Sequence, residues 1–250
     1  MANRIYLNSL EKVDYAQREA FNSLRSNLMF CGAELKTLLF TSCNPNEGKS
    51  TVSFGLARSM AGNQKRVLYV DADMRKSVMM NRYQIQMEQK GQMGLTHFLS
   101  NQASLEDVIV DTNVEGLSMI LTGPLSPNPT ELLAGKRMDL LLEASKNHFD
   151  AVIIDSPPLG MVIDAAVLAP KCDGVILVIE SDSVSRRAEM KVKKQLELTG
   201  CRILGAVLNK VGSERNGYYS KYGKYGKYGR YGRYGRYGYS KYGDYYGEEK

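Results

Sequence analysis

A loop with the residue types of a nucleotide-phosphate site follows the apolar run TLLFT. It reads SCNPNEGKST (residues 42–51) and precedes the helix-like stretch SFGLARSM. In such a loop, backbone N–H groups and a helix N-terminus hold phosphate oxygens, Lys49 reaches the β- and γ-phosphates, and Ser50 ligates Mg²⁺. The motif GKS, placed after a strand and before a helix, therefore predicts a phosphate-binding loop.

The loop departs from the usual pattern at two positions. A glycine is expected five positions before Gly48, where this chain has Cys43, and Asn46 stands where glycine is common. Asparagine adopts the left-handed backbone conformation more readily than most residues, so the second departure is mild. A chance GKS in a surface loop is the alternative, and the flanking strand and helix patterns disfavour it.

Carboxylates end two further apolar runs. Asp71 and Asp73 stand two positions apart in VDADMR, and Asp155 closes the run VIID. Carboxylates that leave a buried strand are costly unless they meet a cation or exchange a proton. An apolar run that closes on one Asp is typical of the second metal anchor of a P-loop NTPase. An acidic turn would explain a DxD motif alone, but the three motifs in this order predict nucleotide chemistry.

Tyrosines crowd the end of the chain. Residues 217–250 have no Leu, Ile, Val or Phe to bury, so we expect a disordered tail. A flexible string of tyrosine hydroxyls beside a phosphate-binding loop indicates a substrate tethered to its own kinase. Of the chain's 16 tyrosines, the 12 predicted phosphoacceptors are Tyr218, Tyr219, Tyr222, Tyr225, Tyr228, Tyr231, Tyr234, Tyr237, Tyr239, Tyr242, Tyr245 and Tyr246.

The positive charge is concentrated in this tail. From Glu214 onward there are nine Lys/Arg and four Asp/Glu, a net +5 out of +6 for the chain, which leaves about +1 for residues 1–213. A nucleic-acid-binding body is therefore not implied, and no nucleic-acid partner is expected. The four cysteines form no CxxC pair and are expected to be reduced thiols. With no signal peptide or apolar membrane span visible, we expect a cytoplasmic protein.

The elements that must position these motifs follow an α/β pattern. Short apolar runs predict strands, and several are continuous, as expected for strands buried on both faces. We predict a mostly parallel central sheet with helices on both faces, in which residues 1–213 form the P-loop domain, residues 1–36 its N-terminal helical segment, and residues 214–250 the tail. The predicted strands cover residues 37–41, 67–70, 117–121, 151–154, 175–179 and 203–208.

With these motifs, the chain resembles the bacterial tyrosine kinases (BY-kinases) of capsule and exopolysaccharide systems. The loop PNEGKS, the segment VLYVDADMRK, the segment VIIDSPP and the tyrosine-rich tail carry the resemblance, which covers nearly the whole chain. It implies an ATP- and Mg²⁺-dependent protein-tyrosine kinase that autophosphorylates its tail. Through the family, it also implies control of polysaccharide chain length or export.

The resemblance also implies residue roles. The expected nucleotide contacts are Asn46, Glu47, Gly48, Lys49, Ser50, Thr51 and, for the adenine base, Asn209. Ser50, Asp73 and Asp155 are the expected Mg²⁺ ligands. Lys49, Asp71 and Asp73 are the expected catalytic residues, with Asp71 as the base that accepts the tyrosine proton. The sequence leaves the assignment between Asp71 and Asp73 open.

The partners that the family implies are a membrane-anchored activator, a phosphotyrosine phosphatase and further copies of the chain. The family's ring-forming E-x-x-R-x-x-R helix appears here as Glu19, Asn22 and Arg25, so the middle Arg is missing and the inference of a ring is weakened. The chain looks like the split form of the family, held at the inner face of the membrane through its activator. The basic tail is also expected to favour an anionic membrane until phosphorylation cancels its charge.

Two rival functions remain from sequence. The first is a cell-division or partition-type ATPase, which shares the fold and the DxD strand. That class carries a Lys four positions before the second Gly of the loop, where this chain has Asn44. The second is a nucleotide-gated scaffold whose tail binds RNA or partner proteins without being phosphorylated.

Overall fold

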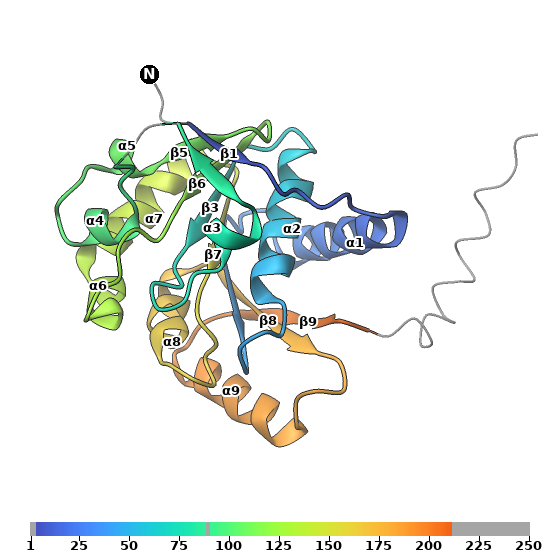
Figure 1. The fold of residues 1–250 in the computed structure, drawn as a ribbon. Coiled ribbons are helices and arrows are strands. Elements are labelled where there is room, and N and C mark those ends of the chain that lie inside the picture. Colours follow the sequence, from blue (N-terminus) through green and yellow to red (C-terminus); the bar gives the residue numbers. More distant parts are fainter. Residues whose placement is uncertain (1–3, 89–90, 212–250) are drawn as a thin grey trace, which may run out of the picture. The chain divides into compact units, whose positions relative to one another are not determined.

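The structure is a computed structural model that describes residues 4–88 and 91–211, in which strands and helices alternate (Figure 1). The strands are β1 (Arg4–Leu7), β2 (Thr37–Ser42), β3 (Val67–Asp71), β4 (Ile85–Met87), β5 (Val110–Thr112), β6 (Leu117–Ile120), β7 (Ala151–Asp155), β8 (Gly174–Glu180) and β9 (Ile203–Asn209). The helices are α1 (Tyr15–Cys31), α2 (Lys49–Ala61), α3 (Met79–Arg82), α4 (Leu95–Leu99), α5 (Leu105–Val108), α6 (Pro129–Ala134), α7 (Lys136–His148), α8 (Asp164–Leu168), the 3-10 turn η1 (Ala169–Lys171) and α9 (Arg186–Leu198).

The strands within the described residues form one nine-stranded sheet, in the order β4-β1-β5-β6-β3-β7-β2-β8-β9. The run from β6 to β9 pairs in parallel, whereas β1 with β4 and β5 with β6 pair antiparallel. This confirms the predicted mostly parallel sheet and all six predicted strands. Strands β1, β4 and β5 were not predicted, because strands of three or four residues carry too short an apolar pattern to be distinguished from loops.

Side chains that alternate along the central strands form two hydrophobic cores, one on each face of the sheet. Leu38 and Phe40 of β2 pack with residues of α1, α2 and α3. Leu39, between them, packs with residues of α4 to α9 on the other face. Every residue of β2, β3 and β7 is buried, which explains why these strands appear in the sequence as continuous apolar runs.

Helix α1 forms where the sequence predicts it but buries little of its surface. Asp14 caps it, since its carboxylate accepts a hydrogen bond from Gln17 N at 2.7 Å. Ala16, Ala20, Leu24 and Leu28 recur at helical spacing along one face of α1, and of these only Leu28 is buried and Leu24 is half-buried. The rest of this face is exposed.

The four cysteines are free thiols, as expected. No helix in the part of the chain that the structure describes is both long and apolar enough to cross a membrane. The tail of residues 214–250, with its 12 predicted phosphoacceptor tyrosines and its expected disorder, lies outside the described residues.

Candidate functional site

The three predicted motifs meet at the carboxyl ends of neighbouring strands. The sheet places β3, β7 and β2 side by side, and Asp71 at the end of β3 is the direct neighbour of Asp155 at the end of β7. The loop of residues 43–48 follows β2 at the same edge. Ligands of open α/β sheets bind at such an edge, so the fold brings the predicted residues into one candidate site.

The loop geometry suits phosphate. Asn46 has φ +67° and Gly48, the residue that precedes α2, has φ +87°, so both adopt the left-handed conformation, as expected for Asn46. A side chain at Gly48 would be strained, and its Cβ would lie 2.0 Å from Asn209 Nδ2. The first N–H groups of the 13-residue helix α2 have no partner within the helix, and they carry its positive dipole end.

Glu47 uses its side chain inside the loop. The carboxylate accepts a hydrogen bond from Asn44 N at 2.7 Å and a longer one from Cys43 N at 3.4 Å, and the residue is buried. Burial raises the pKa of Glu47, and the backbone hydrogen bonds oppose this shift. The side chain therefore stabilises the loop conformation. Any contact of Glu47 with a nucleotide would come from its backbone atoms. Burial, followed by the charge of Glu47, raises the pKa of Cys43 to about 12, so this thiol stays protonated.

The end of β9 holds the loop from the other side. Asn209 Nδ2 donates to the Glu47 carbonyl at 2.9 Å, and Lys210 Nζ donates to the Asn46 carbonyl at 2.7 Å. Lys210 also pairs with Glu180 of β8 at 3.1 Å. The predicted adenine contact, Asn209, therefore lies against the phosphate loop. Lys210 was not predicted as a site residue, although it directly follows Asn209.

At the centre of the site, Lys49 forms a buried ion pair with Asp155. Its Nζ lies 2.8 Å from Asp155 Oδ1 and 3.2 Å from Ser50 Oγ, and the two charged side chains are 7% and 1% exposed. The hydroxyl and the carboxylate are ligand types that Mg²⁺ uses. The described residues contain no group of three or more Asp, Glu, His or Cys that would hold a metal alone. An ion here would take its remaining ligands from phosphate and water, as Mg²⁺ commonly does.

Asp71 lies beside this pair and is buried. Its carboxylate accepts hydrogen bonds from the Ser77 hydroxyl and, at 3.3 Å, from Asp73 N. Burial first, and then the nearby charge of Asp155, raises the pKa of Asp71 to about 8. Asp73 accepts from Lys76 N at 3.0 Å. A buried carboxylate with a raised pKa suits a group that exchanges a proton. Ser77 was not predicted as a site residue.

A second ion pair, which the sequence did not predict, follows the DxD motif. Arg75 Nε and Nη2 donate to the two oxygens of Asp164 at 2.7 and 3.0 Å, and Thr130 Oγ1 donates to the same carboxylate at 2.6 Å. Asp164 is fully buried at the start of α8. Burial acts to raise the pKa of Asp164, but the hydrogen bonds from Arg75 and Thr130 outweigh it and lower the pKa. This pair ties the loop after β3 to α6 and α8.

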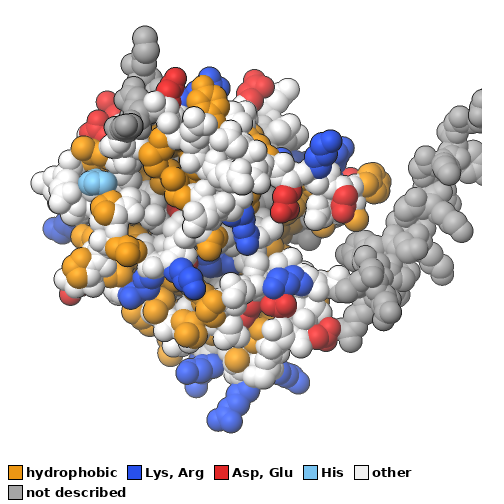
Figure 2. Space-filling view, in the orientation of Figure 1, with side chains coloured by type: hydrophobic (Ala, Val, Ile, Leu, Met, Phe, Trp, Pro, Cys, Tyr) orange, Lys and Arg blue, Asp and Glu red, His pale blue; other side chains and the backbone are white. Residues whose placement is uncertain are grey.

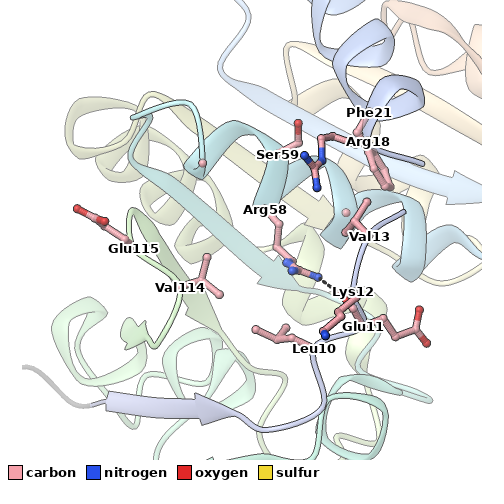
Figure 3. Close-up of a pocket in the computed structure, with 12 residues that line it drawn as sticks. Leu10, Glu11, Lys12, Val13, Arg18, Phe21, Arg58, Ser59, Val114 and Glu115 are labelled. Carbon is pink, nitrogen blue, oxygen red and sulfur yellow. Dashed lines mark hydrogen bonds between the residues drawn. The ribbon is translucent and has the colours of Figure 1, made fainter. Parts of the chain in front are cut away.

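The remaining predicted residue, Thr51, is exposed on α2, and its hydroxyl accepts a hydrogen bond from Arg82 of α3. A pocket of about 650 Å³ lies near the opposite end of α2 (Figure 3). It is lined by Arg58 and Ser59 of α2, Arg18 and Phe21 of α1, and neighbouring loop residues. None of the predicted site residues lines it, so this pocket is separate from the candidate site.

The fold and the site define a P-loop NTPase, and comparisons with known proteins narrow the class. A family model described as an AAA domain matches residues 45–198. The chain is 43% identical to the tyrosine-protein kinase CpsD of Streptococcus agalactiae, over 81% of this chain and 90% of the relative. The chain belongs to the family of bacterial tyrosine-protein kinases, as the motifs indicated.

Solved structures of the kinase family match the chain over most of its length, and a cell-division protein shares the fold. The chimerical protein CapA2B2 matches with a TM-score of 0.75 and 30% identity, over 83% of this chain and 93% of its own. The kinase domain of Escherichia coli tyrosine kinase ETK also matches with a TM-score of 0.75, at 31% identity over 90% and 83%. The septum site-determining protein MinD of Pyrococcus horikoshii, solved with Mg-ADP, matches with a TM-score of 0.61 at 25% identity, over 72% of each chain.

Proposed function

We propose that this kinase transfers the γ-phosphoryl group of ATP to tyrosines of its own C-terminal tail. The observation that supports this most directly is the buried cluster of Lys49, Asp155 and Asp71 at the N-terminus of α2. It combines a cation for phosphate oxygens, a carboxylate for a metal, and a carboxylate whose pKa lies near neutral pH. Phosphoryl transfer depends mainly on positioning and charge neutralisation, which such a cluster supplies.

In the proposed reaction, the tyrosine hydroxyl oxygen bonds to the γ-phosphorus while the bond from that phosphorus to the β–γ bridging oxygen breaks. Asp71 accepts the hydroxyl proton, and ADP leaves with the bridging oxygen. Lys49 would leave Asp155 for the phosphate oxygens, and the backbone N–H groups at the start of α2 would hold the same phosphates. Mg²⁺, when bound by Ser50, Asp155 and Asp73, would neutralise phosphate charge. Asn209, at the end of β9, would contact the adenine.

We further propose that the chain works with a membrane-anchored activator in capsule or exopolysaccharide production. The similarity to the tyrosine-protein kinase CpsD supports the kinase activity. The similarity to the longer tyrosine-protein kinase etk of E. coli K12 supports the proposal of a partner protein. In that protein the matched region is only 28% of the chain, at 35% identity, so further segments accompany its kinase domain. Here a separate activator at the inner face of the membrane would supply the corresponding segment, and a phosphotyrosine phosphatase would reverse the modification.

The proposed ring of subunits has weaker support. Glu19 accepts a hydrogen bond from Asn22 at 3.1 Å, so these two residues of the motif satisfy each other. Arg25 donates to the carbonyl and hydroxyl of Ser59 in α2 at 3.0 and 3.2 Å. Because Arg25 makes these contacts within its own chain, it is less available to a neighbouring subunit. The ring stays a prediction.

The test is incubation of the full chain with ATP and Mg²⁺, followed by intact-mass and peptide mass spectrometry. We expect several phosphates confined to residues 218–246, and none in a Lys49→Met control. If the chain alone gains no phosphate, the assay is repeated with the activator's cytoplasmic segment. ATP turnover without phosphotyrosine would favour a cell-division-type ATPase. ATP binding with neither activity would favour a nucleotide-gated scaffold.

A further inference from the structure

Helix α9 presents cations and large apolar side chains on the same exposed stripe. The stripe consists of Arg187, Met190, Lys191, Lys194 and Leu198, and this spacing of three, four, seven and eleven residues from Arg187 places them on one helix face. All five residues are exposed, and Met190 and Leu198 are 53% and 79% exposed. Figure 2 shows Lys and Arg side chains projecting at the lower edge of the molecule, where α9 lies in Figure 1.

The opposite face of α9 anchors it firmly. Val192 and Leu196 are buried in the core shared with the central sheet, and Ser185 caps the helix through a hydrogen bond to Ala188 N. The stripe is therefore held in a fixed position. It runs about 16 Å along the helix, given a rise of about 1.5 Å per residue.

The charge on α9 is largely uncompensated. The helix has five Lys/Arg and two Glu, a net +3. Glu197 is used in an ion pair with Lys193, beside the stripe. Among the described residues, Lys191 and Lys194 form no ion pair, so their charges face solvent without a carboxylate partner. Such a surface favours a negatively charged partner.

We propose that the α9 stripe is a docking surface for an anionic lipid membrane. A lipid headgroup layer offers phosphates to the cations and, just below them, apolar surface to Met190 and Leu198. A soluble polyanion would engage only the cations and leave these two side chains in water. The proposal does not depend on kinase activity. It makes the globular domain itself, rather than only its partner or tail, a membrane-contacting element.

The test is co-sedimentation of the full chain with vesicles of equal parts phosphatidylglycerol and phosphatidylcholine, and with pure phosphatidylcholine vesicles. The samples contain no ATP, and intact mass confirms that all have the same phosphorylation state. The variant R187Q/K191Q/K194Q is compared with the control K12Q/K65Q/K136Q, which removes three exposed lysines elsewhere. Since each cation near an anionic membrane changes the partition about fivefold, we expect roughly a hundredfold loss for the stripe variant and a much smaller loss for the control.

The variant M190S/L198S separates a membrane from a soluble polyanion. We expect it to lose about tenfold in binding to anionic vesicles, because it removes the side chains that would enter the headgroup layer. Equal partition of the stripe variant and its control would overturn the proposal. Binding of M190S/L198S to anionic vesicles equal to that of the parent would also overturn it. That result would instead make the stripe a surface for a soluble polyanion such as the phosphorylated tail. Circular dichroism and ATP binding show that each variant is folded.

Discussion

Two buried carboxylates beside the nucleotide site, Asp155 and Asp164, are each paired with a cation, and the two pairs differ in kind. Lys49 meets Asp155 through one contact of 2.8 Å, and we propose that both side chains exchange this contact for nucleotide and metal. Arg75 meets Asp164 through two parallel contacts, and Thr130 satisfies the same carboxylate. A single contact between two groups is easily exchanged, whereas a bidentate pair with a third donor is a fixed tie. We therefore assign Lys49 and Asp155 to the reaction, and Arg75 and Asp164 to the support of the site.

The largest expected effect comes from breaking the exchangeable pair. Lys49→Met removes the cation proposed for the γ-phosphate, and we expect phosphorylation to fall by at least about 1,000-fold. Titration with ATP should also show that Lys49→Met binds ATP more weakly, since a phosphate contact is lost. The measurement is phosphate incorporation over time by intact mass. Activity within tenfold of the parent would show that Lys49 does not neutralise charge in the transition state.

Asp71→Asn tests the third member of the central cluster. The amide keeps the shape but cannot accept the tyrosine proton, so we expect the rate to fall by about 100- to 10,000-fold. ATP affinity should stay within a few-fold, because Asp71 is assigned no phosphate contact. Asp73→Asn is the matched comparison for the assignment that the sequence left open. If the phosphorylation rate falls in Asp73→Asn, with ATP binding intact, and does not fall in Asp71→Asn, then Asp73 is the base and Asp71 is not.

Breaking the fixed pair should affect stability first. In Asp164→Asn the guanidinium of Arg75 loses its counter-charge, and breaking a buried ion pair from one side costs several kcal/mol. Because Arg75 is 39% exposed, we expect a loss near the lower end, about 2–3 kcal/mol in the free energy of unfolding. Urea denaturation measures it. If Asp164→Asn that remains folded phosphorylates much more slowly than the parent, Asp164 has a direct catalytic role. That result would contradict the proposal that the Arg75–Asp164 pair only supports the site.

The pH dependence of that loss follows from the lowered pKa of Asp164. A carboxyl whose folded-state pKa lies below its unfolded-state value of about 3.9 stabilises the fold above that value. The stabilisation is lost as the pH falls through the folded-state pKa. The gap between parent and Asp164→Asn should therefore be full at pH 7 and narrow below about pH 4. A gap that widens in acid would mean that the folded-state pKa is raised.

The smallest expected effect lies at the outer edge of the loop. Lys210→Met removes the hydrogen bond to the Asn46 carbonyl and the exposed pair with Glu180, and exposed pairs contribute about 0–1 kcal/mol. We expect ATP affinity to change by a few-fold at most. Asn209→Ala should weaken ATP binding more, since its amide also supports the Glu47 carbonyl. Isothermal titration of ATP distinguishes the two, and the reverse order would show that Lys210 is the main support of the loop.

The sequence predicted the residues whose type and position at a strand end both carry information. Asp71 and Asp155 close apolar runs, Lys49 follows the loop after another, and the parallel arrangement of the strands brings them together. Ser77, Lys210 and Asp164 could not be predicted in the same way, because their roles depend on tertiary contacts. Asp164, for example, lies 89 residues from Arg75 in the chain, and nothing in its own surroundings indicates that partner. The use of the Glu47 side chain within the loop also depends on local backbone geometry that no sequence motif specifies.

The central claim is that this site phosphorylates tyrosine and that the two ion pairs divide catalysis from support. An intact-mass time course of the full chain, Lys49→Met and Asp164→Asn, each with ATP, Mg²⁺ and the activator's cytoplasmic segment, tests it most directly. We predict several added phosphates on the parent, none on Lys49→Met, and on Asp164→Asn a slower gain that recovers under stabilising conditions of lower temperature. Equal phosphate gain by the parent and Lys49→Met, or none by the parent, would contradict the account.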